Sequence, residues 1–240
     1  MVFNYLSYNS TYLIYLAAAV LPALILLFVV YRRDRVEREP AGLLVKLIIM
    51  GVLAALMSVV LETAGESALD LNVTPGTGIY HIIMAFGVVA LAEEGSKYFL
   101  MRLNTWNHPA FNYRFDGIVY AVFVSLGFAA FENIGYVFSY GLETAAFRAV
   151  LSIPGHLSFA VFMGFYYGRS KYYHNRKKRI RGFLASVMSL LTAVLFHGTY
   201  DACLMLDTEE STAFFLVFVA IMFLIVFFLL RRESKKDRAL

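Results

Sequence analysis

The stretch IYHIIMAFGVVALAEEGSKYFLM, residues 79–101, is apolar over most of its length, yet it holds two glutamates and a lysine in its interior. A transmembrane helix needs about 20 predominantly apolar residues, so this stretch is long enough to span a bilayer. A charged side chain near the centre of such a helix costs about 2.5–3.5 kcal/mol on insertion scales. Glu93, Glu94 and Lys97 therefore indicate a function that requires charge inside the membrane.

The rest of the chain has the same apolar character. Of its 240 residues, 60% are hydrophobic and 16% are charged, and the mean hydropathy is +0.67. Soluble domains are about 45–50% apolar and about 25% charged. We therefore expect an all-α, polytopic membrane protein with a single integral-membrane domain over residues 1–240. The apolar runs predict about seven helices, near residues 12–31, 43–62, 79–100, 116–140, 146–168, 183–205 and 212–230.

The first apolar run, the cysteine count and the basic clusters further restrict the kind of membrane protein that the sequence can form. The first apolar run lacks the charged segment that precedes a cleavable signal, so it is expected to stay as a helix. Cys203 is the single cysteine, which excludes an intrachain disulfide. The basic clusters flank apolar segments and do not belong to a soluble module. The expected surroundings are therefore the lipid bilayer, and nucleic acid is not an expected partner.

The charges of the connecting segments predict the orientation. YRRDRVEREP (31–40), GRSKYYHNRKKRIRG (168–182) and RRESKKDRAL (231–240) are basic, whereas the segment 63–78 has no lysine or arginine and LDTEES (206–211) is acidic. Basic and non-basic connections alternate along the chain. The positive-inside rule then places the N-terminus outside and the C-terminus in the cytoplasm.

Ionisable residues inside the predicted helices are concentrated in the third to sixth. Several lie three or four residues apart, the spacing that brings side chains to one helix face. Counted at 1.5 Å per residue, they fall near one depth in the membrane, and we expect them to converge on one site. Pro154 and Gly155 predict a kink just before one of them. The residues are Glu93, Glu94 and Lys97, then Glu132 with Tyr136, then His156, and finally His197 with Asp201.

These residue types suit hydrolysis of a carbonyl compound. A carboxylate next to an imidazole can deprotonate a water, and a second imidazole can stabilise an oxyanion. The same types also bind divalent metals. A zinc ion held by ligands drawn from Glu132, His156, His197 and Asp201 would suit the residues equally well. The HExxH signature of many metalloproteases is absent, and the residues alone leave both mechanisms open.

At these positions the chain resembles a known family. EEGSK, FENIGY and HGTYD match, in order, the EExxK, FExxxY and HxxxD motifs of PrsW-type intramembrane proteases, which are related to the CPBP/Abi proteins and type II CAAX prenyl endopeptidases. The resemblance covers the chain in helix count and motif order. It implies a multi-pass endopeptidase of a prokaryotic cell membrane that cuts a membrane-anchored protein, such as a single-pass regulatory protein of anti-sigma type.

The resemblance also implies roles for particular residues. Glu93 and Glu94 fall on the essential glutamate pair, and one of them would activate water together with His156. His197 and Asp201 would take the places of the histidine and asparagine that stabilise the oxyanion, with Lys97, Glu132 and Tyr136 in support. Asp201 departs from the CAAX pattern, because an ionised carboxylate accepts hydrogen bonds and does not donate them. It would more naturally orient His197 or bind metal.

Other functions remain to be weighed against the protease. Buried glutamates and histidines also form proton relays, so a proton- or ion-coupled transporter is the main alternative. Transporters commonly have paired halves with matching broken helices, and the sequence has neither. A retinal protein needs a lysine in the last helix, which has none. A non-catalytic membrane scaffold would not need the complete motif set.

Overall fold

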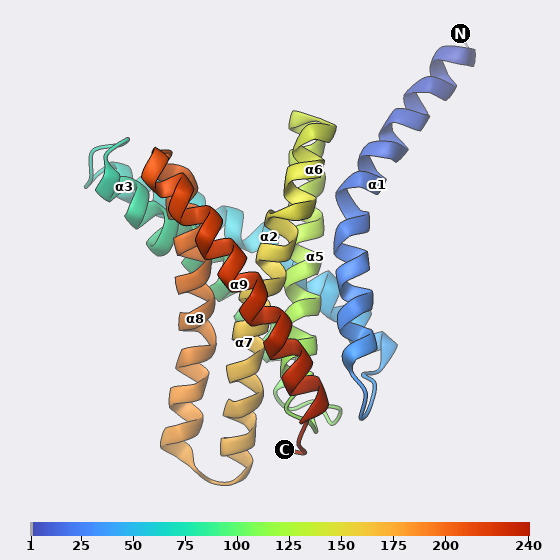
Figure 1. Cartoon of the computed structure of the whole chain (residues 1–240), viewed down its shortest axis with the longest axis vertical. Helices are drawn as coiled ribbons and strands as arrows, with labels where there is room; N and C mark the ends of the chain where they lie inside the picture. Colours follow the sequence, from blue (N-terminus) through green and yellow to red (C-terminus); the bar gives the residue numbers. More distant parts are fainter. Residues whose placement is uncertain (1) are drawn as a thin grey trace.

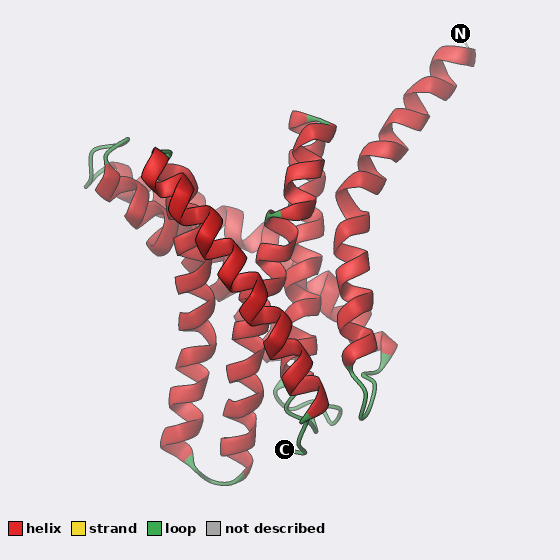
Figure 2. Ribbon diagram, viewed as in Figure 1, coloured by secondary structure: helices red, strands yellow, loops and turns green. Residues whose placement is uncertain are grey.

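The computed structural model describes residues 2–240, with side chains from Thr11 onward, and this part of the chain is helical without β-strands (Figure 2). The α-helices and one π-helix, η1, follow one another along the chain (Figure 1). They are α1 (Val2–Arg33), α2 (Ala41–Asp70), α3 (Gly78–Ile83), η1 (Met84–Ala90), α4 (Leu91–Thr105), α5 (Asp116–Tyr140), α6 (Leu142–Val150), α7 (Ser152–Asn175), α8 (Arg179–Leu206) and α9 (Glu209–Lys235).

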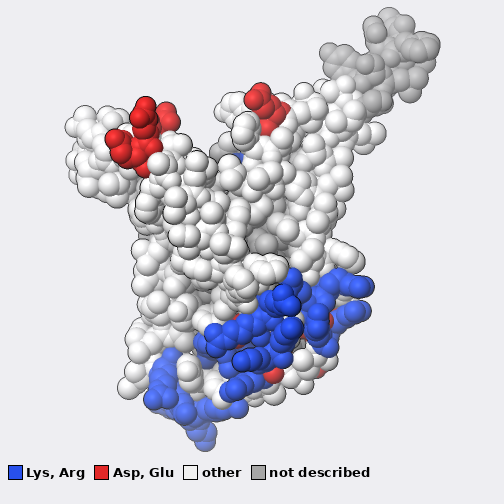
Figure 3. Space-filling model, in the orientation of Figure 1, with Lys and Arg blue, Asp and Glu red and all other residues white. Residues whose placement is uncertain are grey.

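The seven predicted membrane spans are confirmed. Seven helical stretches within the described residues are long and apolar enough to cross a bilayer, and each overlaps one predicted range. The third span is built from α3, η1 and α4, and the fifth from α6 and α7. Figure 3 shows lysine and arginine gathered at one end of the bundle and acidic residues at the opposite end. That separation agrees with the predicted orientation, which stays a prediction.

The helix α5 forms the centre of the bundle and packs against α1, α2 and α7. Its buried face is continuous from Asp116 to Ala129. A close approach between α5 and α7 requires glycine, since a methyl group at Gly164 would overlap the backbone of Gly117 and Ile118. Helices approach this closely only where a small residue faces the neighbouring backbone. This contact brings the first turns of α7 beside α5.

The third span contains seven π-helical residues, Met84–Ala90, and ends its π-helical part three residues before Glu93. The wider i→i+5 turn of a π-helix is rare and occurs often at functional sites. Here α8 packs against it, and a methyl group at Gly198 would overlap the ring of Phe86. Gly198 follows His197 directly. The close contact therefore brings His197 beside the helix that carries Glu93 and Glu94.

The break in the fifth span lies at Leu151, three residues before Pro154. The sequence correctly predicted an interruption before His156 but attributed it to a kink at the proline. Pro154 instead occupies the first turn of α7, where a backbone N–H has no intrahelical partner and proline is tolerated. The short helix α6 thus packs as a separate element against α1, α5 and α7.

Candidate active site

The centre of the site is a buried ammonium group. Lys97 Nζ lies 2.8 Å from Glu93 Oε2 and 2.8 Å from Glu94 Oε1, as the three- and four-residue spacings predict. It also lies 3.8 Å from the centre of the Phe128 ring. All three charged side chains are buried. Lys97 neutralises part of the negative charge that the glutamate pair brings into the membrane interior.

His156 joins this cluster to a second carboxylate. Its Nδ1 lies 3.4 Å from Lys97 Nζ, and its Nε2 lies 3.2 Å from Glu132 Oε2. With Nε2 protonated and donating to Glu132, the lone pair of Nδ1 faces the Lys97 ammonium that the glutamate pair holds. A carboxylate that fixes the tautomer of a histidine in this way is common behind metal-binding and catalytic imidazoles.

Arg148 of α6 holds Glu132 in place. Its Nη2 donates to Glu132 Oε2 over 2.7 Å, and its Nε donates to Asn133 Oδ1 over 2.8 Å. Asn133 in turn donates to the carbonyl of Ala19 in α1. Arg148 was not among the site residues that the sequence predicted. The signal that could have identified it was the lack of any other cation near Glu132 in the apolar sequence.

His197 lies between two carboxylates. Its Nδ1 is 3.0 Å from Glu94 Oε1, and its Nε2 is 3.2 Å from Asp201 Oδ2. Its ring stacks on Phe159, with the centroids 4.7 Å apart. Both hydrogen bonds form only when both ring nitrogens carry a proton. Asp201 therefore contacts His197 as an orienting acceptor, as an ionised carboxylate would.

A cavity of about 440 Å³ opens beside these groups. Glu93 lines it, whereas Glu94 and Lys97 lie behind the lining. Glu62 of α2 also lines it. The structure thus brings every sequence-predicted site residue to one place, with Tyr136 at the wall beside Arg148. The other predicted residues of the lining are Glu132, His156, His197 and Asp201.

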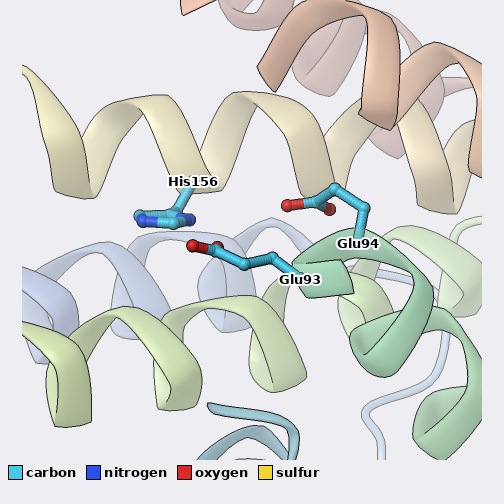
Figure 4. Close-up of side chains that lie close together, drawn as sticks. All are labelled: Glu93, Glu94 and His156. Carbon is cyan, nitrogen blue, oxygen red and sulfur yellow. The ribbon is translucent and has the colours of Figure 1, made fainter. Parts of the chain in front are cut away.

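The donor set at the centre is compatible with a divalent metal. Among the described residues, Glu93, Glu94 and His156 each offer one ligand atom, and the three atoms lie within 4.8 Å of one another (Figure 4). Glu94 Oε2 is buried without a hydrogen-bond partner, as a vacant ligand atom would be. This set shares only His156 with the ligands considered from the sequence. Lys97 Nζ lies between the same groups, so a metal ion would require the ammonium to move aside.

The chain was compared with known protein families. The family described as PrsW family intramembrane metalloprotease matches residues 39–230. The chain belongs to the PrsW family. It is therefore an integral, multi-pass membrane protease, and the family expected from the three motifs is confirmed.

Individual PrsW relatives align over most of the chain. Protease PrsW of Clostridioides difficile (strain 630) is 35% identical over 208 residues, which cover 85% of this chain and 84% of that protein. Protease PrsW of Oceanobacillus iheyensis is 33% identical, covering 92% and 96%. Protease PrsW of Bacillus subtilis (strain 168) is 31% identical, covering 93% and 95%. No solved structure gives a significant match. The transporter alternative has no support from these matches.

Proposed function

We propose that this PrsW-family protease hydrolyses a peptide bond of a membrane-anchored protein, such as a single-pass regulatory protein of anti-sigma type. The cut would be made in the cavity between α4, α5, α7 and α8. The observation that carries the proposal is the position of Glu93 and His156 at the wall of a cavity that lies within the membrane spans.

Glu93 is proposed to act on the attacking water. Of the two adjacent glutamates, only Glu93 lines the cavity, whereas Glu94 has no exposed surface. A general base must come within hydrogen-bond reach of the proton that it takes. His156 lines the same cavity and is held by Glu132 through Nε2. The water would therefore be oriented between the Glu93 carboxylate and the His156 ring.

Glu94 is proposed to act as a positioning residue. Its Oε1 accepts hydrogen bonds from both Lys97 and His197, so it fixes the ammonium and the second imidazole relative to each other. His197 lines the cavity and would face the carbonyl oxygen as negative charge develops there. Asp201 would keep the His197 ring in its orientation.

Glu93, Glu94 and His156 would hold a divalent metal such as zinc. The charges of the site are compatible with this assignment: four carboxylates meet two permanent cations and a doubly protonated His197, so negative charge is in excess even before Glu62 of the same cavity is counted. The carboxylates belong to Glu93, Glu94, Glu132 and Asp201, and the cations are Lys97 and Arg148. A metal bound there would polarise the substrate carbonyl and make a bound water more acidic.

Arg148 is proposed as a positioning residue that acts through Glu132. With one nitrogen on Glu132 and another on Asn133, the guanidinium fixes the acceptor to which His156 donates. Groups that orient a catalytic or metal-binding histidine typically contribute about 10- to 100-fold to activity or metal affinity. Arg148 also lies 3.9 Å from the Tyr136 ring centre, which restricts its side chain further.

The proposal is tested with purified protein in liposomes that contain a single-pass substrate protein. Cleavage is followed by the appearance of fragments, and mass spectrometry identifies the cut. We expect Glu93→Gln to abolish cleavage. Glu143→Gln, the same change at an exposed position of α6, should cleave at the wild-type rate. Wild-type activity in a folded Glu93→Gln variant would refute the role of Glu93.

The metal is tested separately by elemental analysis of the purified protein and by cleavage after chelation. Stoichiometric zinc, with activity that is lost to a chelator and restored by zinc, would support the Glu93, Glu94 and His156 site. Full activity in a metal-free preparation would refute it and leave water activation to Glu93 and His156 alone.

A further inference from the structure

A second cavity lies far from the active site, at the basic end of the bundle. It has a volume of about 630 Å³ and lies between the last turns of α1 and α9. The apolar part of its lining consists of Phe28, Val29 and Phe227, and all three side chains are exposed. The charged part consists of Arg32, Arg33, Arg35, Arg231 and Lys235. We refer to this cavity as the α1–α9 groove.

The cations of the α1–α9 groove have no acidic partner. Among the residues whose side chains the structure describes, no carboxylate oxygen lies within 4.0 Å of these five groups. Other arginines at the same end are paired, since Arg114 and Arg169 both contact Glu233. Five positive charges around one cavity repel one another, and a bound anion would relieve that repulsion.

A hydrogen bond from a side chain to the backbone joins the two walls of the groove at the helix ends. The Ser234 hydroxyl of α9 donates to the carbonyl of Arg33 at the end of α1. The guanidinium of Arg33 lies 5.7 Å from the centre of the Phe227 ring. The cations are therefore presented on a fixed pair of helix ends. A flexible tail would not hold them in this arrangement.

The order of apolar and charged groups along the groove identifies the ligand. On both helices Phe28, Val29 and Phe227 precede the charged residues and belong to the candidate membrane spans. The cations follow at the helix ends, at the end of the bundle where Figure 3 shows lysine and arginine gathered. A phospholipid has the same order, with acyl chains in the interior and a phosphate at the surface. Basic pockets between transmembrane helices at the cytoplasmic side are known to take anionic headgroups.

We propose that the α1–α9 groove binds an anionic phospholipid. Its phosphate would lie among Arg32, Arg33, Arg35, Arg231 and Lys235, and its acyl chains would lie against Phe28 and Phe227. A free phosphate would use the cations only and leave the apolar part of the groove uncovered. The bound lipid would hold α9 against α1, two helices that otherwise share few contacts.

The test compares lipids and two matched double variants by native mass spectrometry of the purified protein in mild detergent. Phosphatidylglycerol should bind with a stoichiometry of one and at least about tenfold more tightly than phosphatidylcholine. Arg231→Gln/Lys235→Gln should lose about tenfold in affinity. Arg179→Gln/Arg181→Gln removes the same charge in the first turn of α8, at exposed positions outside the groove, and should change the affinity less than about twofold.

Additional variants and folding checks distinguish loss of the lipid site from misfolding and from non-specific charge attraction. Arg32→Gln alters the opposite wall and should weaken binding in the same direction. Each variant is first checked for a single elution peak and a wild-type melting temperature in phosphatidylcholine. Equal losses in the two double variants would show general charge attraction and overturn the proposal. Wild-type affinity for phosphatidylglycerol in Arg231→Gln/Lys235→Gln would also overturn it. Binding of inorganic phosphate as tight as that of phosphatidylglycerol would overturn it as well.

Discussion

The Nε2 atom of His156 in α7 lies 3.2 Å from Glu132 Oε2 in α5. This contact is the central link between Lys97, which holds the glutamate pair of α4, and Arg148 of the separate helix α6. Glu132 accepts from His156 and from Arg148 on the same oxygen. The chemistry proposed for Glu93 and His156 therefore depends on a helix that does not itself carry a reacting group.

The first prediction concerns Arg148. Replacement of Arg148 by glutamine should lower kcat by about 10- to 100-fold, because Glu132 loses the cation that fixes it, while KM for the substrate protein changes little. Arg148→Lys keeps the charge and should recover part of the rate. The measurement is the cleavage rate in liposomes as a function of substrate density. An unchanged kcat would contradict a positioning role, and so would a variant in which only KM rises.

The second prediction concerns the stability supplied by Lys97. Lys97→Met leaves two buried carboxylates without their shared cation, and loss of one partner from a buried ion pair costs about 3–5 kcal/mol. A large fall in melting temperature is therefore expected in detergent. Lys46→Met removes a lysine at an exposed position of α2 and should leave the melting temperature close to that of the wild type.

The position of Lys97 also makes a prediction about metal. Because its ammonium lies between the groups that would hold the ion, Lys97→Met should be stabilised more by added zinc than the wild-type protein is. The measurement is the zinc-dependent change in melting temperature of both proteins. Equal changes in the two would contradict competition between the ammonium and a metal for this position.

The fourth prediction concerns the packing of α8 on the π-helix. Gly198→Ala places a methyl group against the Phe86 ring and should destabilise the protein by about 1–3 kcal/mol, with a loss of activity because His197 moves with the backbone. Gly135→Ala is the control, since nothing lies within 4 Å of its added methyl group. Thermal unfolding and cleavage are measured on both. Equal melting temperatures of the two variants would show that the space between Gly198 and Phe86 can accept a methyl group.

The fifth prediction concerns pH and the segment between α1 and α2. Burial raises the pKa of Asp34 to about 6 and the pKa of Glu39 to about 7. Glu39 Oε2 also accepts a hydrogen bond from the Tyr120 hydroxyl over 2.8 Å. An acid whose pKa is raised by folding binds more protons in the folded state than in the unfolded state. Its contribution to stability is present below about pH 4.5 and is lost as the pH rises through about 7.

The melting temperature should therefore fall between pH 5 and pH 8. Glu39→Gln keeps a side-chain acceptor for Tyr120 but does not ionise, so the fall should become smaller in this variant. Glu143→Gln, at an exposed position, should retain the wild-type dependence. A pH dependence unchanged by Glu39→Gln would assign the effect to other groups.

The sequence predicted the architecture because a bilayer restricts what a chain can form. Seven apolar runs can only be helices, and spacings of three or four residues place Lys97 beside Glu93 and Glu94 and His197 beside Asp201. These relationships lie within one helix. The ordered motifs identified the family for the same reason, since each motif occupies about one turn.

Relationships between helices were harder to predict. The π-helix at Met84–Ala90 has no composition that distinguishes it from α-helix, so its position was not expected. Arg148 reaches Glu132 because the chain reverses at Gly141, where φ is 87°, and α6 then packs back against α5. The candidate metal ligands in the structure also differ from those considered from the sequence. Spacing within one helix does not show that Glu93 and Glu94 both lie near His156 of another helix.

Both cations of the active site are already engaged by carboxylates, and this has a consequence for the design of inhibitors. The cavity wall presents Glu93, Glu132 and Asp201 with no unpaired lysine or arginine among the described residues of its lining. A peptidomimetic with a protonated amine directed at Glu93 should gain affinity, whereas an anionic warhead would be repelled unless zinc is bound. The ratio of the two affinities would then report the occupancy of the metal site.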